Sequence, residues 1–388
     1  MDLLLGVQGA ASWALHWILP FIVVLSVVVV IHELGHFWMG RLFGTKIDSF
    51  SVGFGPEIFS RIDKLGTRWR VAWLPLGGYV KFYGDMGPAS EPDPEILEAL
   101  KKDGVDHSEV FHFKPLYQRV LIILAGPLAN FVLAIAIFAG ALMVVGEPNV
   151  PPVVTSVSEG LPAEAAGFEA GDLIVEMNGR HITNFTEVLP VIAMSAGASL
   201  TFVVQRGSEE VTLSVTPQEE SREDRFGNVH QLGVIGLTFT EEPEWVRYGP
   251  IVATAKGTRQ TYDIVTQTFV YLGRVISGRQ SADQLGGPLR IAQASGQIAS
   301  ISPFALIQLI AILSVSIGLV NLFPIPILDG GHLVFYGYEA LAGKPLGEGA
   351  QEVGFRVGLV VVLSLMIFAT WNDLVHLQVF EFLEGMFS

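Results

Sequence analysis

The chain of 388 residues has no cysteine and few charged side chains. Without cysteine it can form neither disulfide bonds nor thiolate metal ligands, so any zinc site must use histidine and carboxylate side chains. Charged residues make up 16% of the sequence and hydrophobic residues 50%, which is too apolar for an ordinary soluble protein. The composition therefore predicts several membrane spans combined with soluble parts, and contact with a lipid bilayer.

Basic residues are scarce as well. Lys and Arg number 23 against 38 Asp and Glu, which gives a formal net charge of -15. Because a protein that binds nucleic acid presents a basic face to the phosphates, we expect no nucleic-acid partner.

Four apolar stretches are long enough to cross a membrane, and we expect about four transmembrane helices. They are Trp17 to Trp38, Leu116 to Val145, Phe304 to Phe323 and Val357 to Trp371, the last being the shortest. Four basic residues flank the segment between the first two spans, namely Arg41, Lys46, Lys114 and Arg119. Basic residues favour the cytoplasmic side, so this loop is predicted to be cytoplasmic, and the N-terminus and residues 147–302 to lie outside.

The first span runs directly into an HExxH motif formed by His32, Glu33 and His36. On a helix the two histidines share one face, where their imidazoles can bind one zinc ion, while Glu33 is placed to take a proton from water. Ionisable residues at membrane depth cost about 2.5 to 3.5 kcal/mol each, so three of them within five positions need a compensating partner. A bound cation would compensate them, and the motif therefore indicates a metalloprotease rather than a helix end that faces water.

A third ligand is expected after the third span, where the sequence reads Pro324-Ile325-Pro326-Ile327-Leu328-Asp329. The two prolines leave backbone groups without helical partners, which membranes tolerate only where the segment is buried or lines a wet cavity. Catalytic zinc takes three protein ligands and keeps one open position. Asp329 is the best candidate for the third ligand, and His332 is its rival.

Two asparagines lie within or at the end of apolar spans. Asn130 follows the small residues at positions 125, 126 and 129, which allow another helix to approach closely, and should hydrogen-bond to that helix. Structural support is one interpretation of Asn130. The other is that Asn130 and Asn321 orient an unwound substrate strand or stabilise the oxyanion.

Two regions alternate in the way typical of strands. Residues 50–82 predict a membrane-associated β-hairpin, whose exposed edge could pair with an extended peptide or could only pack on the helices. Residues 151–240 read as a soluble β-rich module with turns at Asn178-Gly179 and Arg206-Gly207. The acidic stretch between positions 84 and 109 is predicted to be a loop with one short helix around Pro94 to Lys102. Residues 241–299 predict an amphipathic helix, either interfacial or packed in a soluble part.

Together these motifs resemble those of the site-2 protease family of intramembrane zinc metalloproteases. The matching segments follow the family's order and span most of the chain: His32 to His36, Phe54 to Pro56, Pro75 to Lys81, Gly126 to Asn130 and Pro324 to Gly331. The resemblance implies Zn²⁺ held by His32, His36 and Asp329, with Glu33 as the catalytic base. It also implies a polytopic α-helical membrane protein with an inserted PDZ domain.

The PDZ part of the resemblance is carried by Leu161 to Gly167, Gly171 to Ile174 and Asn178-Gly179. A peptide-binding loop is then expected late in the module, as in circularly permuted bacterial PDZ domains, at Gly233, Val234, Ile235, Gly236 and Leu237. Residues 150–240 have room for one such domain, whereas enterobacterial members of the family carry two in tandem.

The resemblance also implies regulated intramembrane proteolysis. Its substrates would be single-span membrane proteins such as anti-sigma factors, already trimmed by an upstream site-1 type protease, and remnant signal peptides. The protein would lie in the inner membrane of a bacterium, with its N-terminus and PDZ domain in the periplasm and its active site toward the cytoplasm.

We expect four parts in the chain: residues 1–145, 150–240, 241–302 and 303–388. Two rival functions are a PDZ-bearing membrane scaffold with a structural zinc site, and a zinc transporter. Glu33 argues against the scaffold, because a structural site has no use for a carboxylate that is not a ligand. A transporter would need ionisable residues on several spans, and none occurs between Val357 and Thr370.

Overall fold

The computed structural model describes residues 2–87, 96, 99, 107–223, 229–239, 244–278 and 286–376. The short helix predicted around Pro94 to Lys102 lies outside these residues, apart from positions 96 and 99, which are helical. The contacts divide the chain into two compact units, unit 1 with Met1–Gly140 and Ile251–Ser388, and unit 2 with Ala141–Pro250. Unit 2 is thus inserted between the two halves of unit 1.

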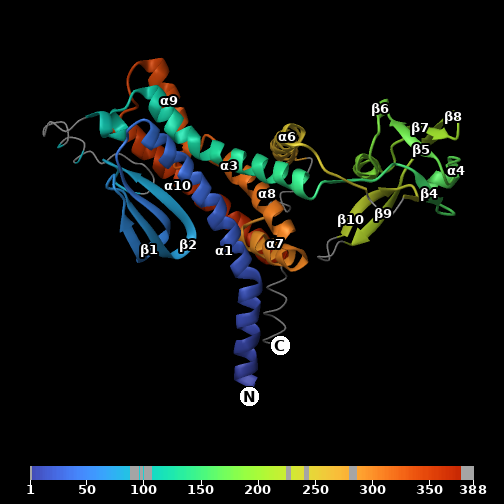
Figure 1. Ribbon diagram of the computed structural model, residues 1–388, viewed down its shortest axis with the longest axis horizontal. Helices are drawn as coiled ribbons and strands as arrows, with labels where there is room; N and C mark the ends of the chain where they lie inside the picture. Colours follow the sequence, from blue (N-terminus) through green and yellow to red (C-terminus); the bar gives the residue numbers. More distant parts are fainter. Residues whose placement is uncertain are drawn as a thin grey trace. The chain divides into compact units, whose positions relative to one another are not determined.

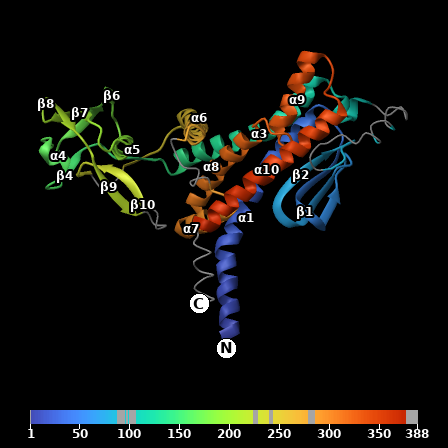
Figure 2. The same cartoon turned by 180° about the vertical axis from the view of Figure 1, so that it is seen from behind.

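The helices outside the inserted unit are long and mostly apolar, and Figures 1 and 2 show them from two sides. They are α1 (Asp2–Leu42), α3 (Leu116–Val144), α6 (Pro250–Ile276), α7 (Pro288–Ile301), α8 (Pro303–Asn321), α9 (Asp329–Ala342) and α10 (Glu348–His376). Two short 3₁₀ helices, η1 (His107–Glu109) and η2 (Phe111–Phe113), precede α3.

Among the described residues, four helices are long and apolar enough to cross a membrane: Leu15–Leu42, Leu116–Val144, Pro303–Asn321 and Gly349–Val375. The four predicted spans are therefore confirmed. The fourth is longer than predicted because α10 continues beyond the apolar run at both ends, further toward its N-terminus, where Arg356 pairs with Glu352 one turn away.

Small residues let the helices of unit 1 approach closely. A Cβ atom built on Gly35 of α1 would collide with the Ala125 carbonyl of α3, and one built on Gly318 of α8 would lie 3.1 Å from the Asn130 Cβ. The approach predicted from the small residues of the second span is observed, and it brings α3 into close contact with both the HExxH helix and α8.

The predicted hairpin is present as β1 (Ile47–Ile62) and β2 (Arg68–Phe82), and it curls so that one segment of β1 is paired on both sides. Residues 49–52 pair with residues 78–81 on one side and with residues 68–71 on the other, while residues 57–62 pair with residues 68–72. The resulting sheet has the half of β2 that ends at Phe82 at one edge. Figure 1 shows this sheet beside α1.

Two side chains of α1 fasten this edge of β2. The Ser26 hydroxyl donates to the Pro75 carbonyl at 2.8 Å, and Glu33 Oε2 accepts from the Val80 N–H at 3.0 Å. The sheet edge therefore runs along the helix that carries the HExxH motif.

Unit 2 is a β-rich domain around one apolar core, as predicted for the inserted module. Its largest sheet is antiparallel with the order β6-β5-β7-β8. Three further pairs of strands are present: β4 with β11, β9 with β10, and β3 with β12. Alternate residues of β7 are buried, including Phe202 and Val204, as expected for a sheet with one face on a core.

The strands of unit 2 are β3 (Glu147–Asn149), β4 (Val154–Val157), β5 (Leu173–Met177), β6 (Arg180–His181), β7 (Leu200–Arg206), β8 (Glu209–Val215), β9 (Gln218–Glu223), β10 (Val229–Val234), β11 (Leu237–Phe239) and β12 (Glu244–Val246). Its helices are α4 (Pro162–Ala165), η3 (Phe185–Glu187) and α5 (Val188–Met194). The predicted fold class, a polytopic helical membrane protein with an inserted β-rich domain, is confirmed.

Candidate metal centre

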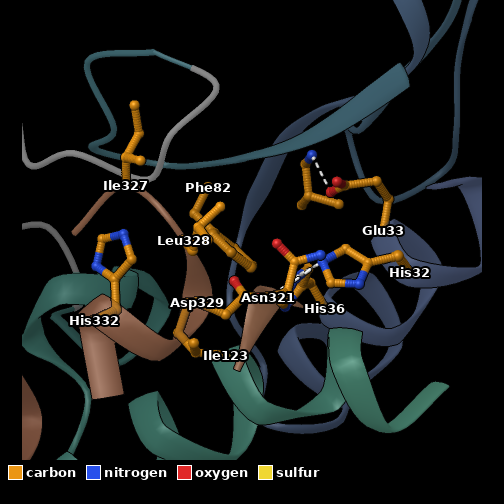
Figure 3. A pocket seen from close by; sticks show the side chains of 11 residues that line it. His32, Glu33, His36, Phe82, Ile123, Asn321, Ile327, Leu328, Asp329 and His332 are labelled. Carbon is orange, nitrogen blue, oxygen red and sulfur yellow. Dashed lines mark hydrogen bonds and ion pairs between the residues drawn. The ribbon is translucent and has the colours of Figure 1, made fainter. Parts of the chain in front are cut away.

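Three side chains from two distant parts of the sequence bring their ligand atoms together in unit 1. His32 and His36 of α1 and Asp329 of α9 each offer one atom, and these atoms lie within 4.8 Å of one another. Asp329 Oδ2 lies 3.1 Å from His32 Nε2 and 3.5 Å from His36 Nε2, and the two Nε2 atoms are 3.2 Å apart. Figure 3 shows the three side chains converging. Among the described residues this is the group able to hold a metal ion.

The local sequence explains how Asp329 reaches the two histidines. The prolines at 324 and 326 end the helical path of α8, and α9 begins at Asp329. Gly330 and Gly331 follow, and a Cβ atom on Gly330 would collide with the Leu322 and Phe323 carbonyls. The glycines thus allow the tight turn that aims Asp329 at α1.

The donor set suits zinc. Two imidazole nitrogens and one carboxylate oxygen are three protein ligands of the kinds that zinc takes at catalytic sites. In addition, Asp329 Oδ2 is buried, and among the described residues it makes no hydrogen bond, although His32 Nε2 and His36 Nε2 lie 3.1 and 3.5 Å away. A buried carboxylate oxygen normally has a partner, and a cation at this point would supply one.

The backbone of α3 orients His36. The Ile122 carbonyl lies 2.9 Å from His36 Nδ1 and can only accept, so Nδ1 carries the proton and Nε2 keeps a free lone pair for a metal. Gly126 leaves space for the ring, because a Cβ atom there would collide with His36 Nε2. The sequence indicated neither contact, since both depend on how α3 packs against α1.

Glu33 lies next to the three candidate ligands without belonging to them. It lines the same cavity, and its Oε2 accepts from the Val80 N–H, which holds the carboxylate against β2. A carboxylate in this position can exchange protons with a water molecule in the cavity.

The cavity has a volume of about 150 Å³. It is lined by residues of α1, β2, α3 and the α8–α9 segment, which are His32, Glu33, His36, Val80, Phe82, Ile123, Asn321, Ile327, Leu328, Asp329 and His332. The hairpin edge expected to hold a substrate strand is thus beside the candidate ligands, with Val80 and Phe82 of β2 in the lining. Only the curled hairpin brings Val80 and Phe82 to the motif.

The two predicted asparagines occupy different places. Asn321 lines the cavity, whereas Asn130 is fully buried and is not part of the lining; its Nδ2 lies 3.3 Å from His32 Nδ1. The rival ligand His332 lines the cavity but is not in the group of converging ligand atoms.

Unit 2 has a groove of its own, with a volume of about 330 Å³. The predicted peptide-binding residues Gly233, Val234, Ile235, Gly236 and Leu237 all line it, opposite Leu189, Ile192 and Ala193 of α5. The groove therefore lies between a helix and the segment that joins β10 to β11.

Comparison with known proteins connects this chain to peptidases. It matches the family model described as peptidase family M50 over residues 20–365. It is 44% identical over 371 residues to a protein of Agrobacterium fabrum that is named as a zinc metalloprotease, with 95% of this chain and 98% of the relative covered. It is 40% identical over 385 residues to metalloprotease MmpA of Caulobacter vibrioides, with 94% and 97% covered.

Two solved structures resemble a smaller part of the chain. The PDZ domain of the SdrC-like protein from Listeria monocytogenes is 24% identical, covers 24% of this chain and 90% of that one, and gives a TM-score of 0.19. The PDZ domain of the SdrC-like protein from Listeria innocua is 26% identical, with 24% and 96% covered and a TM-score of 0.19.

Proposed function

The chain belongs to peptidase family M50 and is a zinc metalloendopeptidase of the site-2 type, and from this premise we propose how it cleaves its substrates. Zinc is held by His32, His36 and Asp329, and peptide bonds are hydrolysed within or beside transmembrane segments of other proteins. The observation that carries this proposal is the convergence of the three ligand atoms within 4.8 Å, next to a carboxylate that is not one of them.

The roles of the side chains follow from their positions. Zinc bound at this site would supply Lewis acidity toward the scissile carbonyl and toward a water molecule. Glu33, which lines the cavity, is placed to take a proton from a water molecule there and to pass it to the leaving amine. Asn321, which lines the cavity, positions the substrate strand or stabilises the oxyanion.

The edge of β2 is proposed to hold the substrate. A helical substrate hides its carbonyls in its own hydrogen bonds, so it must unwind before cleavage, and unsatisfied backbone groups in lipid cost several kcal/mol each. Among the described residues, residues 78–82 pair with β1 on one side only, and their other side meets Glu33 at Val80. A substrate strand added at this edge would regain its backbone hydrogen bonds beside the catalytic carboxylate.

The natural substrates are proposed to be single-span membrane proteins. These include anti-sigma factors already trimmed by an upstream site-1 type protease, and remnant signal peptides. The groove of unit 2 is proposed to be a PDZ peptide-binding groove for an extended segment, supported by its position between α5 and residues 233–237. Titration with fluorescent apolar peptides should show binding that Leu189→Arg removes, and equal binding by both proteins would contradict this role.

The proposed location is the inner membrane of a bacterium, with unit 2 in the periplasm and the metal centre toward the cytoplasm. The basic residues that flank the loop between the first two spans support this orientation. Since the chain has no cysteine, single cysteines introduced at Lys64 and Ser208 can be labelled without background. An impermeant reagent outside the cytoplasmic membrane should label position 208 and not position 64, and the reverse pattern would contradict the orientation.

One assay tests the proposed function. The protein is purified in detergent, its bound zinc is measured, and three versions of a single-span substrate are offered: without an ectodomain, with a folded ectodomain, and without an ectodomain but with N-methylated amides beside the scissile bond. We expect about one zinc per chain and fast cleavage of the first substrate only, because a bulky ectodomain blocks access and N-methylation removes strand hydrogen bonds.

Each substrate isolates one part of the proposal. No zinc, or no cleavage of the first substrate, would contradict the protease mechanism. Fast cleavage with the folded ectodomain would contradict the need for earlier trimming, and fast cleavage of the N-methylated substrate would contradict strand addition at β2.

A further inference from the structure

The fully buried side chain of Asn130 in α3 meets the imidazole of His32 on the side away from the other candidate ligands. Its amide lies 3.3 Å from His32 Nδ1, whereas His32 Nε2 faces Asp329. In the structure, the amide nitrogen faces the imidazole ring. Asn130 Oδ1 is buried and has no hydrogen-bond partner among the described residues.

Zinc binding decides which way this amide must be turned. His32 can offer Nε2 to a metal only when the proton is on Nδ1, and an Nδ1–H needs an acceptor. The two orientations of an asparagine amide, related by exchange of its nitrogen and oxygen, have nearly the same shape. The positions of the two atoms are therefore assigned from their hydrogen bonds. With the amide turned over, Asn130 Oδ1 accepts from His32 Nδ1–H at the distance now measured to Nδ2.

The two histidines then have equivalent partners. His36 Nδ1–H donates to the Ile122 carbonyl, and His32 Nδ1–H donates to the Asn130 side chain, about two helical turns further along the same helix α3. Partners of this kind fix the tautomer and the ring orientation of metal-binding histidines.

Besides α1 and α3, the helix α8 contributes to this arrangement, because it holds Asn130 in place. The Ser314 hydroxyl donates to the Asn130 backbone carbonyl at 2.9 Å, and Gly318 lies against its Cβ, where a further methyl group would be only 3.1 Å away. Asn130 is therefore enclosed between α1 and α8, and it does not line the cavity into which a substrate would bind.

We infer that Asn130 is a positioning residue that fixes His32 in its zinc-binding tautomer, and that the substrate does not contact it. This inference rests on the proposed zinc site. It gives Asn130 a role different from that of Asn321, and of the two interpretations that the sequence left open for Asn130 it favours structural support over substrate positioning.

The test measures the zinc dissociation constant of the full-length protein by competition with a chelator. Asn130→Leu, which has a similar size but no acceptor, should weaken zinc binding about 10- to 100-fold, the usual cost of losing such a partner. Asn130→Asp keeps an acceptor and should bind zinc at least as tightly as the wild type. Ser316→Ala on the same helix α8 removes a hydroxyl that bonds to the Ile312 carbonyl of its own helix, and it should bind zinc normally.

The outcomes separate the possibilities. Zinc binding by Asn130→Leu equal to that of the wild type, with slower cleavage, would overturn the inference and favour substrate positioning. Weaker binding by Asn130→Asp than by Asn130→Leu would also overturn it. If Asn130→Leu does not fold, as judged by circular dichroism without metal, Asn130→Ala takes its place with the same expected loss. Absence of zinc from the wild type would overturn the proposed function first, and this inference with it.

Discussion

Replacing Glu33 by glutamine is expected to slow peptide-bond cleavage about 100-fold or more while the protein keeps its zinc. The three candidate ligands are His32, His36 and Asp329, and Glu33 is not among them. Glutamine preserves the size of the side chain but cannot take a proton from water. General-base catalysis contributes about 10²- to 10⁴-fold, so the cleavage rate should fall by that factor. The measurement is the initial rate on a substrate without an ectodomain, together with the zinc content of both proteins.

A matched control is Glu352→Gln on the exposed part of α10. Glu352 pairs with Arg356 one turn away, and exposed pairs of this kind contribute little. This variant should cleave at the wild-type rate. Cleavage by Glu33→Gln at more than one tenth of the wild-type rate would remove Glu33 from the mechanism. Loss of zinc from Glu33→Gln would instead make Glu33 part of the metal site.

Adding a single methyl group at Gly126 is expected to destroy the metal centre. A Cβ atom at this position would overlap His36 Nε2 and lie 2.9 Å from His36 Cδ2. The ring cannot move freely, because His36 Nδ1 is held by the Ile122 carbonyl on the same helix. Gly126→Ala should therefore displace His36 Nε2 from the site and weaken zinc binding about 100-fold, with cleavage lost at ordinary zinc concentrations.

The matched control is Gly140→Ala, also in α3, where a Cβ atom would meet nothing within 4 Å. Alanine at an open helical position is neutral or stabilising by about 0.5–1 kcal/mol, so this variant should bind zinc and cleave normally. Chelator competition and the melting temperature without metal distinguish a displaced ligand from a damaged fold. Normal zinc binding by Gly126→Ala would show that His36 tolerates the methyl group and would contradict the packing described between α1 and α3.

Much of this protein could be predicted from its sequence because the signals are local. Membrane spans depend on runs of apolar residues, and the positions of all four were predicted, although the fourth run is longer than its apolar core alone indicated. The pairing of His32 with His36 depends only on helical periodicity. The strands of the inserted unit follow the alternation of buried and exposed residues, as in β7.

Only the tertiary structure decided what surrounds those residues. The sequence left Asp329 and His332 as rivals, and the turn at Gly330 and Gly331 brings the Asp329 carboxylate to the histidines. It likewise left two interpretations of Asn130 open, structural support or a role shared with Asn321. Packing separates the two asparagines, because α8 encloses Asn130 behind His32 and Asn321 lines the cavity. Such differences depend on contacts between segments far apart in the chain, at distances of a few ångströms. Periodicity along one segment carries no information about those distances, so the ligand types could be predicted while their orienting partners could not.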